Sequence, residues 1–174
     1  LQNSQLENGK VRFQQASDDS TKQIGFDPSM LDLYDLQWDI RQLTIDSQRI
    51  AADILSLQGS DHSGLAIQHL SSQLNMSDSL LALQDFSLKT PHSKFEFSTQ
   101  RTYPGFNAFE AFQSKDALVL KRILAHAEVK QFRLSPEDLY LLLPNTLPAG
   151  LKDDFELMAV VDGSMDRLKV ENLK

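Results

Sequence analysis

One hydrophobic pattern recurs along this chain and constrains its fold more than any other feature. An apolar residue is followed by a second one three positions later, and by a third two positions after that. Successive copies begin at Leu33, Ile40, Ile67, Leu83 and Val129, and the copy at Ile67 is degenerate. A spacing of two keeps side chains on one face of a β-strand, whereas a spacing of three reverses the face. A strand therefore keeps all three residues on one face only where it carries a bulge or a sharp bend.

Strands bent in this way predict a curved antiparallel sheet with an apolar inner face. Strand-like units recur roughly every 10–16 residues between short polar turns, and no helical crossover separates most of them, as in an antiparallel meander. The expected fold class is mainly β: an open hydrophobic groove, or β-taco, with one or two short helices. The residues expected on the groove floor, in contact with any apolar cargo, are Trp38, Ile40, Leu43, Ile45, Ile67, Leu70, Leu74, Leu83, Phe86, Leu88, Phe132 and Leu134.

The same periodicity is also expected of one half of a closed β-sandwich, in which a second sheet covers the apolar face. In that case the chain would be an adhesion or carbohydrate-binding module. Such a module needs aromatic side chains on an exposed platform, and the chain has one Trp and three Tyr. The spacing of three in every copy favours the groove, because the strands of a flat sandwich do not need the bulge or bend that this spacing implies.

Further local signals predict a turn, a helix and a strand. Asn8 and Gly9, flanked by apolar residues, indicate a hairpin turn. The segment 118–129 fits either a helix or a strand, and we expect a strand because it leads directly into the last copy of the pattern. A short helix is expected where three phenylalanines recur at a spacing of three, at Phe106, Phe109 and Phe112.

The clearest helix start lies after the last copy of the pattern. Ser135 is a favourable N-cap, Pro136 suits the first helical position, and Asp138 completes a capping box. Pro144 and Pro148 are expected to end this helix.

Composition limits the possible functions and the organisation of the chain. Its 174 residues fit one domain. A net charge of −7 without a basic cluster argues against nucleic-acid binding. The absence of Cys excludes disulfides and thiolate metal sites. The chain starts with Leu1 and has neither a signal peptide nor an apolar run near 18 residues, so we expect residues 1–174 to be a single β-groove segment excised from a longer, repeat-built protein.

Residues that could carry catalysis or bind a metal are sparse. His62 beside Asp61 is the best candidate base or metal ligand, although a solvated pair in a loop is the favoured interpretation. The sequence contains no nucleophile elbow, phosphate loop or dinucleotide fingerprint. We therefore expect no enzymatic activity, no catalytic residue, no cofactor and no metal.

Several stretches resemble the TamB-type translocation and assembly module proteins, which belong to the AsmA-like group of Gram-negative envelope proteins. The resemblance covers nearly the whole chain, and its most distinctive part ends at Ser93 in the sequence Leu-Lys-Thr-Pro-His-Ser. The stretches that carry it are residues 6–13, 25–28, 31–40, 83–93, 132–144 and 161–170.

The resemblance implies a segment of a periplasm-spanning protein whose inner-membrane anchor lies outside this chain. Its hydrophobic β-groove would conduct lipids, support outer-membrane protein assembly, or both. The implied partners are phospholipid or other hydrophobic cargo, and an outer-membrane assembly partner bound through regions outside the chain. The cut ends and edges of such a sheet are also expected to allow end-to-end or edge-to-edge self-association.

Overall fold

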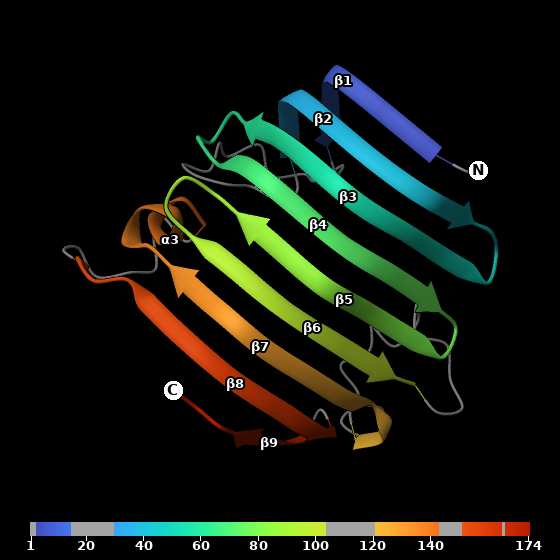
Figure 1. Cartoon of the computed structure of the whole chain (residues 1–174), viewed down its shortest axis with the longest axis vertical. Coiled ribbons are helices and arrows are strands. Elements are labelled where there is room, and N and C mark those ends of the chain that lie inside the picture. The colour runs from blue at the N-terminus through green and yellow to red at the C-terminus, as the bar shows by residue number, and fades with distance from the viewer. Residues whose placement is uncertain (1–2, 15–29, 104–120, 143–150, 165) are drawn as a thin grey trace.

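The computed structural model describes residues 3–14, 30–103, 121–142, 151–164 and 166–174. These residues form one open antiparallel sheet of nine strands, whose order in the sheet is their order in the chain (Figure 1). The strands are β1 (Asn3–Gln14), β2 (Met30–Ile45), β3 (Arg49–Asp61), β4 (Ala66–Ser77), β5 (Leu80–Lys89), β6 (Lys94–Thr102), β7 (Leu124–Leu134), β8 (Phe155–Ser164) and β9 (Arg167–Glu171). The expected fold class, an open and curved antiparallel sheet with a short helix, is confirmed.

Short polar turns connect several neighbouring strands. Between β2 and β3, the carboxylate of Asp46 accepts hydrogen bonds from the backbone N–H groups of Gln48 and Arg49, both at 2.8 Å. Between β3 and β4, Asp61 accepts a hydrogen bond from the backbone N–H of Ser63 at 2.8 Å. An Asp that bonds to the backbone two residues later stabilises a tight turn, which explains how such long strands reverse direction over so few residues.

Every copy of the recurring pattern contains a β-bulge. In the first copy, Leu33 pairs with Val11 and Leu36 pairs with Gly9, so three residue steps on β2 oppose two on β1. The other four copies show the same mismatch, at register shifts in β2, β4, β5 and β7. Because the extra residue reverses the alternation once, the first and second apolar residues of each copy, three positions apart, project from the same face. The bend inferred from the sequence is thus present in all five copies.

The residue immediately before the second apolar residue takes up the backbone distortion in three of these copies. Asp35, Gln42 and Asp85 have φ angles of 51°, 52° and 46°. This left-handed region costs energy for residues with a side chain, and Asp is one of the few types that enter it readily. The polar residue at this position of the pattern therefore helps to form the bulge.

Asn8 and Gly9 do not form the predicted hairpin turn. β1 runs through both residues, and its pairing with β2 shifts register between Leu6 and Gly9. Asn8 has a φ of 54°, and a Cβ on Gly9 would lie 2.2 Å from Cδ2 of Leu6. Asn8 thus has the left-handed conformation that Asn-Gly sequences favour, and Gly9 leaves space for the Leu6 side chain, but both lie within a bulge.

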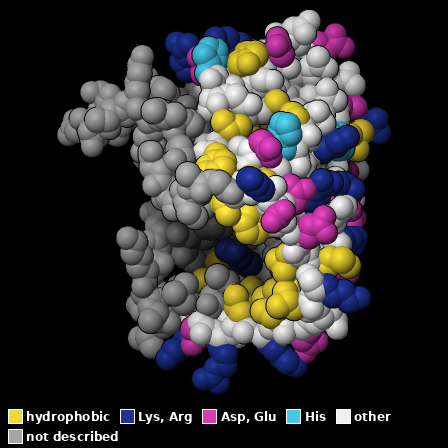
Figure 2. All heavy atoms as spheres, turned by 90° about the vertical axis from the view of Figure 1, so that its left-hand side faces the viewer, with side chains coloured by type: hydrophobic (Ala, Val, Ile, Leu, Met, Phe, Trp, Pro, Cys, Tyr) yellow, Lys and Arg dark blue, Asp and Glu magenta, His cyan; other side chains and the backbone are white. Residues whose placement is uncertain are grey.

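The two faces of the sheet differ in polarity. Figure 2 shows most of the hydrophobic side chains towards one side of the sheet, beside a hollow, and most of the charged side chains towards the other. This separation follows from strand alternation once the bulges are included. We call the first side the apolar face and the second the polar face.

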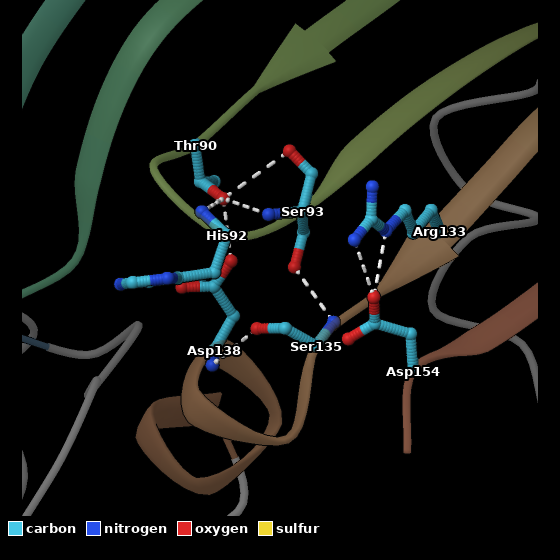
Figure 3. A network of polar contacts seen from close by, with 7 residues as sticks. All are labelled: Thr90, His92, Ser93, Arg133, Ser135, Asp138 and Asp154. Carbon is cyan, nitrogen blue, oxygen red and sulfur yellow. Dashed lines mark hydrogen bonds and ion pairs between the residues drawn. The ribbon is translucent and has the colours of Figure 1, made fainter. Parts of the chain in front are cut away.

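The helix α3 (Pro136–Leu142) begins where the sequence predicts, but its cap differs from the predicted capping box. Oγ of Ser135 accepts a hydrogen bond from the backbone N–H of Asp138 at 3.2 Å, as an N-cap does. The Asp138 carboxylate does not return to Ser135. It accepts a hydrogen bond from the Thr90 hydroxyl, and the Ser135 N–H instead donates to Oγ of Ser93 at 3.0 Å (Figure 3). The cap thus joins α3 to the β5–β6 turn.

The remaining sequence expectations have mixed outcomes. Strand β7 begins at Leu124, and Lys121 and Arg122 are helical, so the predicted strand over 118–129 is confirmed only from Leu124 onward. The expected helix around Phe106, Phe109 and Phe112 lies outside the described residues, as do residues 118–120, Pro144 and Pro148. Within the described residues, no helix is both long and apolar enough to cross a membrane.

Candidate functional site: the apolar face

Cross-strand pairing builds a continuous row of large apolar side chains along the apolar face. Each member pairs directly with the next, and the row runs from β1 to β8. Directly paired residues project from the same face of a sheet. The row therefore crosses these strands without a polar residue. In order, its members are Leu6, Trp38, Leu57, Leu70, Leu88, Phe95, Phe132 and Leu157.

The pairing places all of the predicted floor residues on this face. Four of them, Trp38, Leu70, Leu88 and Phe132, are members of the row. The others alternate with row members or join the same face across a bulge; they are Ile40, Leu43, Ile45, Ile67, Leu74, Leu83, Phe86 and Leu134.

Sequence reasoning missed several residues that contribute equally to this face. Leu57 on β3 and Phe95 and Phe97 on β6 belong to strands that lack a full copy of the pattern. The signal that could have found them is simple alternation: Phe95 and Phe97 stand two apart in a segment of strand-forming residues.

The side chains of the row are half-buried and not sealed. All eight members have intermediate exposure, and Ile45 at the end of β2 is 67% exposed. Leu36 and Ala159 are buried, but no large side chain among the described residues is fully enclosed. In a closed sandwich the second sheet would enclose this row. The described strands instead form one sheet, so they do not fit the sandwich alternative.

Aromatic contacts reinforce the floor. Phe86 stacks on Phe97 with ring centroids 4.5 Å apart, and Phe95 meets Phe132 edge to face at 4.8 Å. Both geometries are favourable for aromatic pairs. The indole N–H of Trp38 donates to Oγ of Ser4 at 3.1 Å, which satisfies its polar atom within the sheet.

Two ionisable residues project from the apolar face among the described strands, Asp61 and Arg101. Asp61 pairs with Leu33 and is 5% exposed. Burial by itself raises the pKa of the Asp61 carboxyl, but hydrogen bonds from Ser63 and from the backbone N–H of Asp32 outweigh this and hold that pKa below its ordinary value of 3.8. Asp61 is thus a structural turn residue at one end of the face. Arg101 lies at the other end, between Leu81 and Ala125.

Exposed ion pairs lie on the polar face. Lys130 reaches Asp85 at 3.3 Å, and Nδ1 of His126 lies 2.6 Å from Asp162. Exposed pairs of this kind contribute little to stability, and their main effect is to keep the face hydrated. A pocket of about 670 Å³ on this side is lined by amide side chains such as Gln73 and Gln84, together with smaller aliphatic ones such as Ala51 and Ala82. The lipid-binding candidate is therefore restricted to the opposite face.

His62 and Asp61 do not form the metal or base site considered from the sequence. The Asp61 carboxylate bonds to the backbone of Ser63 and Asp32, while the His62 ring packs edge-on against Tyr34 with centroids 5.2 Å apart. Nδ1 of His62 lies 3.9 Å from Asp32. In the part of the chain that the structure describes, no group of three or more potential metal ligands converges.

No family model matches the chain, and no curated protein or solved structure is significantly similar to it. What the apolar face can do is therefore inferred from its geometry.

Proposed function

We propose that this chain is a groove-forming segment of a Gram-negative envelope protein, and that its apolar face holds the acyl chains of lipids in transit. The observation that carries the proposal is the unbroken apolar row from Leu6 to Leu157, which lies on an open face whose side chains remain half-exposed. Half-exposed apolar surface of this extent is unusual for a soluble protein unless it binds something apolar.

The energetics favour sliding over tight capture. Each methylene removed from water contributes roughly 0.8 kcal/mol. Strands lie about 4.8 Å apart, so the row from β1 to β8 is roughly 34 Å long. An acyl chain spans about half of the ~30 Å hydrocarbon core of a bilayer, so the row is about twice as long as one acyl chain. Because similar apolar residues continue on either side, one position along the row binds about as well as the next.

The resemblance to envelope translocation and assembly proteins suggests where such a groove would work. In a periplasmic protein anchored in the inner membrane, the segment would carry phospholipid across an aqueous compartment. Apolar strands of unfolded outer-membrane proteins are the other cargo that this face could hold. A catalytic role is not part of the proposal.

Site-specific photocrosslinking in Gram-negative cells tests the proposal. A photoreactive amino acid at Leu70, on the apolar row, is expected to capture phospholipid. The matched control is Gln73 on the same strand, which projects from the polar face and is exposed. Lipid adducts at Leu70 and none at Gln73 support the proposal. Adducts to polypeptide alone at Leu70 would indicate that the cargo is protein and not lipid. The absence of any adduct would contradict the groove function.

A further inference from the structure

Arg101 is the one cationic residue on the apolar face among the described strands. It pairs with Leu81 on β5 and with Ala125 on β7, so it shares their face. Along its own strand it alternates with Thr99 and with Phe97 of the floor. Its neighbours on the face are therefore aliphatic or small.

This arginine is half-buried and has no partner among the described residues. No hydrogen bond or ion pair joins its guanidinium group to any of them. Two arginines on the polar face differ in this respect: Arg133 binds Asp154 at 2.6 Å, and Arg12 binds Asp32 at 2.7 Å. A guanidinium group held against an apolar surface without a counter-ion is costly unless a ligand supplies the anion.

We propose that Arg101 binds the phosphate group of an amphiphile whose acyl chain lies on the apolar face, along β6. This inference rests on the proposed function and specifies its cargo as a phosphate-bearing lipid. The planar guanidinium group presents donors in a fork that matches phosphate oxygens. Ala125 and Gly163 follow Arg101 in register on β7 and β8, and their small size leaves room beside the guanidinium for a headgroup.

The spacing along β6 fits this arrangement. A strand advances about 3.3 Å per residue, so Phe97 lies roughly 13 Å and Phe95 roughly 20 Å from Arg101. An acyl chain is about 15 Å long in one leaflet of a bilayer. A lipid with its phosphate at Arg101 would thus place the end of its chain between these two phenylalanines, at the line of bulges. Arg101 would then hold headgroups at the rim of the groove while the chains occupy its floor.

The test compares two soluble fluorescent probes that share one acyl chain, a lysophosphatidic acid and a monoacylglycerol. The full 174-residue chain is expected to bind the phosphate-bearing probe about tenfold more tightly, the usual effect of a hydrogen bond to a charged group. Arg101→Gln is expected to remove this difference while leaving monoacylglycerol binding within twofold. Arg101→Lys should retain part of it because the charge remains. Arg41→Gln, which neutralises an arginine of the polar face, is the matched control and should retain all of it.

Each alternative result is informative. If the wild-type chain binds both probes equally, or if Arg101→Gln and Arg41→Gln behave alike, the assignment of Arg101 is wrong and the groove function stands. If the wild-type chain binds neither probe, the groove function fails with it. Inorganic phosphate distinguishes a headgroup from free phosphate: it should not displace the lysophosphatidic acid at concentrations comparable to that probe. Displacement at such concentrations would identify a free phosphate site and overturn the headgroup assignment.

Discussion

Phe86 and Phe97 stack across β5 and β6 with their ring planes inclined by 26°, and this contact depends on a bulge. Phe86 pairs directly with Phe97, and Leu83 pairs directly with Thr99. On β5 three residue steps separate Leu83 from Phe86, whereas on β6 only two separate Phe97 from Thr99. Without the extra residue on β5, Phe86 would project from the polar face. The aromatic part of the floor therefore depends on the backbone conformation of Asp85, whose φ is 46°.

Replacing Asp85 by Val should destabilise the sheet. Valine is branched at Cβ and enters the left-handed region poorly, so Asp85→Val is expected to lower the free energy of unfolding by about 1–2 kcal/mol. The measurement is urea unfolding followed by circular dichroism. Asp85→Asn is the control, because it removes the exposed ion pair with Lys130 but tolerates the same φ. Equal stability of the two variants would show that the bulge does not depend on this residue.

Thr90 and Asp138 provide a second test, at the junction of α3 with the sheet. Both are buried, and the Thr90 hydroxyl donates to the Asp138 carboxylate (Figure 3). Thr90→Val keeps the shape of the side chain but leaves the carboxylate without this donor. We expect a loss of about 1–3 kcal/mol in the free energy of unfolding, together with faster hydrogen exchange at Leu139.

The matched control at this position is Thr90→Ser, which keeps the hydroxyl and removes a methyl group. It should retain the slow exchange of α3. If Thr90→Val instead keeps the wild-type stability and the slow exchange of α3, the hydrogen bond from Thr90 to Asp138 contributes nothing.

The acid sensitivity of the chain should depend in part on Asp61. Its pKa lies below the ordinary value of 3.8 in the folded state, because hydrogen bonds from Ser63 and Asp32 outweigh the effect of burial. The unfolded chain therefore binds a proton first as the pH falls, so the stabilisation by Asp61 is present above about pH 4 and is lost as the pH falls through the folded pKa.

Asp61→Asn isolates this contribution. Its free energy of unfolding should fall below that of the wild type at pH 7, and the difference should shrink steadily below pH 4. Denaturant unfolding at several pH values provides the measurement. A difference that is independent of pH would mean that the Asp61 charge is irrelevant to folding.

The sequence was sufficient to predict the apolar face, because each bulge leaves a local trace. The three-residue step between Leu33 and Leu36 requires a reversal of face, whatever strand lies alongside. Alternation then extends the prediction to residues such as Trp38. This is why every predicted floor residue lies on one face, although nothing in the sequence says which ligand covers it.

Features that depend on distant segments could not be predicted in this way. The side chain that donates to the Asp138 carboxylate comes from Thr90, 48 residues earlier, whereas the predicted capping box pairs that carboxylate with the backbone of Ser135. Asn8 has the left-handed conformation that an Asn-Gly sequence favours, but β2 continues alongside β1, so the residue lies in a bulge and not in a turn. Arg101 was not recognised as facing the floor, because its face follows from the pairing of β6 with β5 and β7.

The last prediction concerns the openness of the face itself. Leu70 and Phe86 are half-buried, so a double substitution to Glu should cost far less than in a sealed core, where each large side chain contributes about 2–5 kcal/mol. We expect Leu70→Glu with Phe86→Glu to remain folded by circular dichroism and to lose co-purifying lipid in native mass spectrometry, because two carboxylates make the floor unfavourable for an acyl chain. Gln73→Glu with Gln84→Glu adds the same charge to directly paired positions on the polar face of the same two strands, and should retain the lipid. Unfolding of the first variant alone would indicate that the row is an enclosed core, and equal lipid loss in both would indicate a general effect of charge.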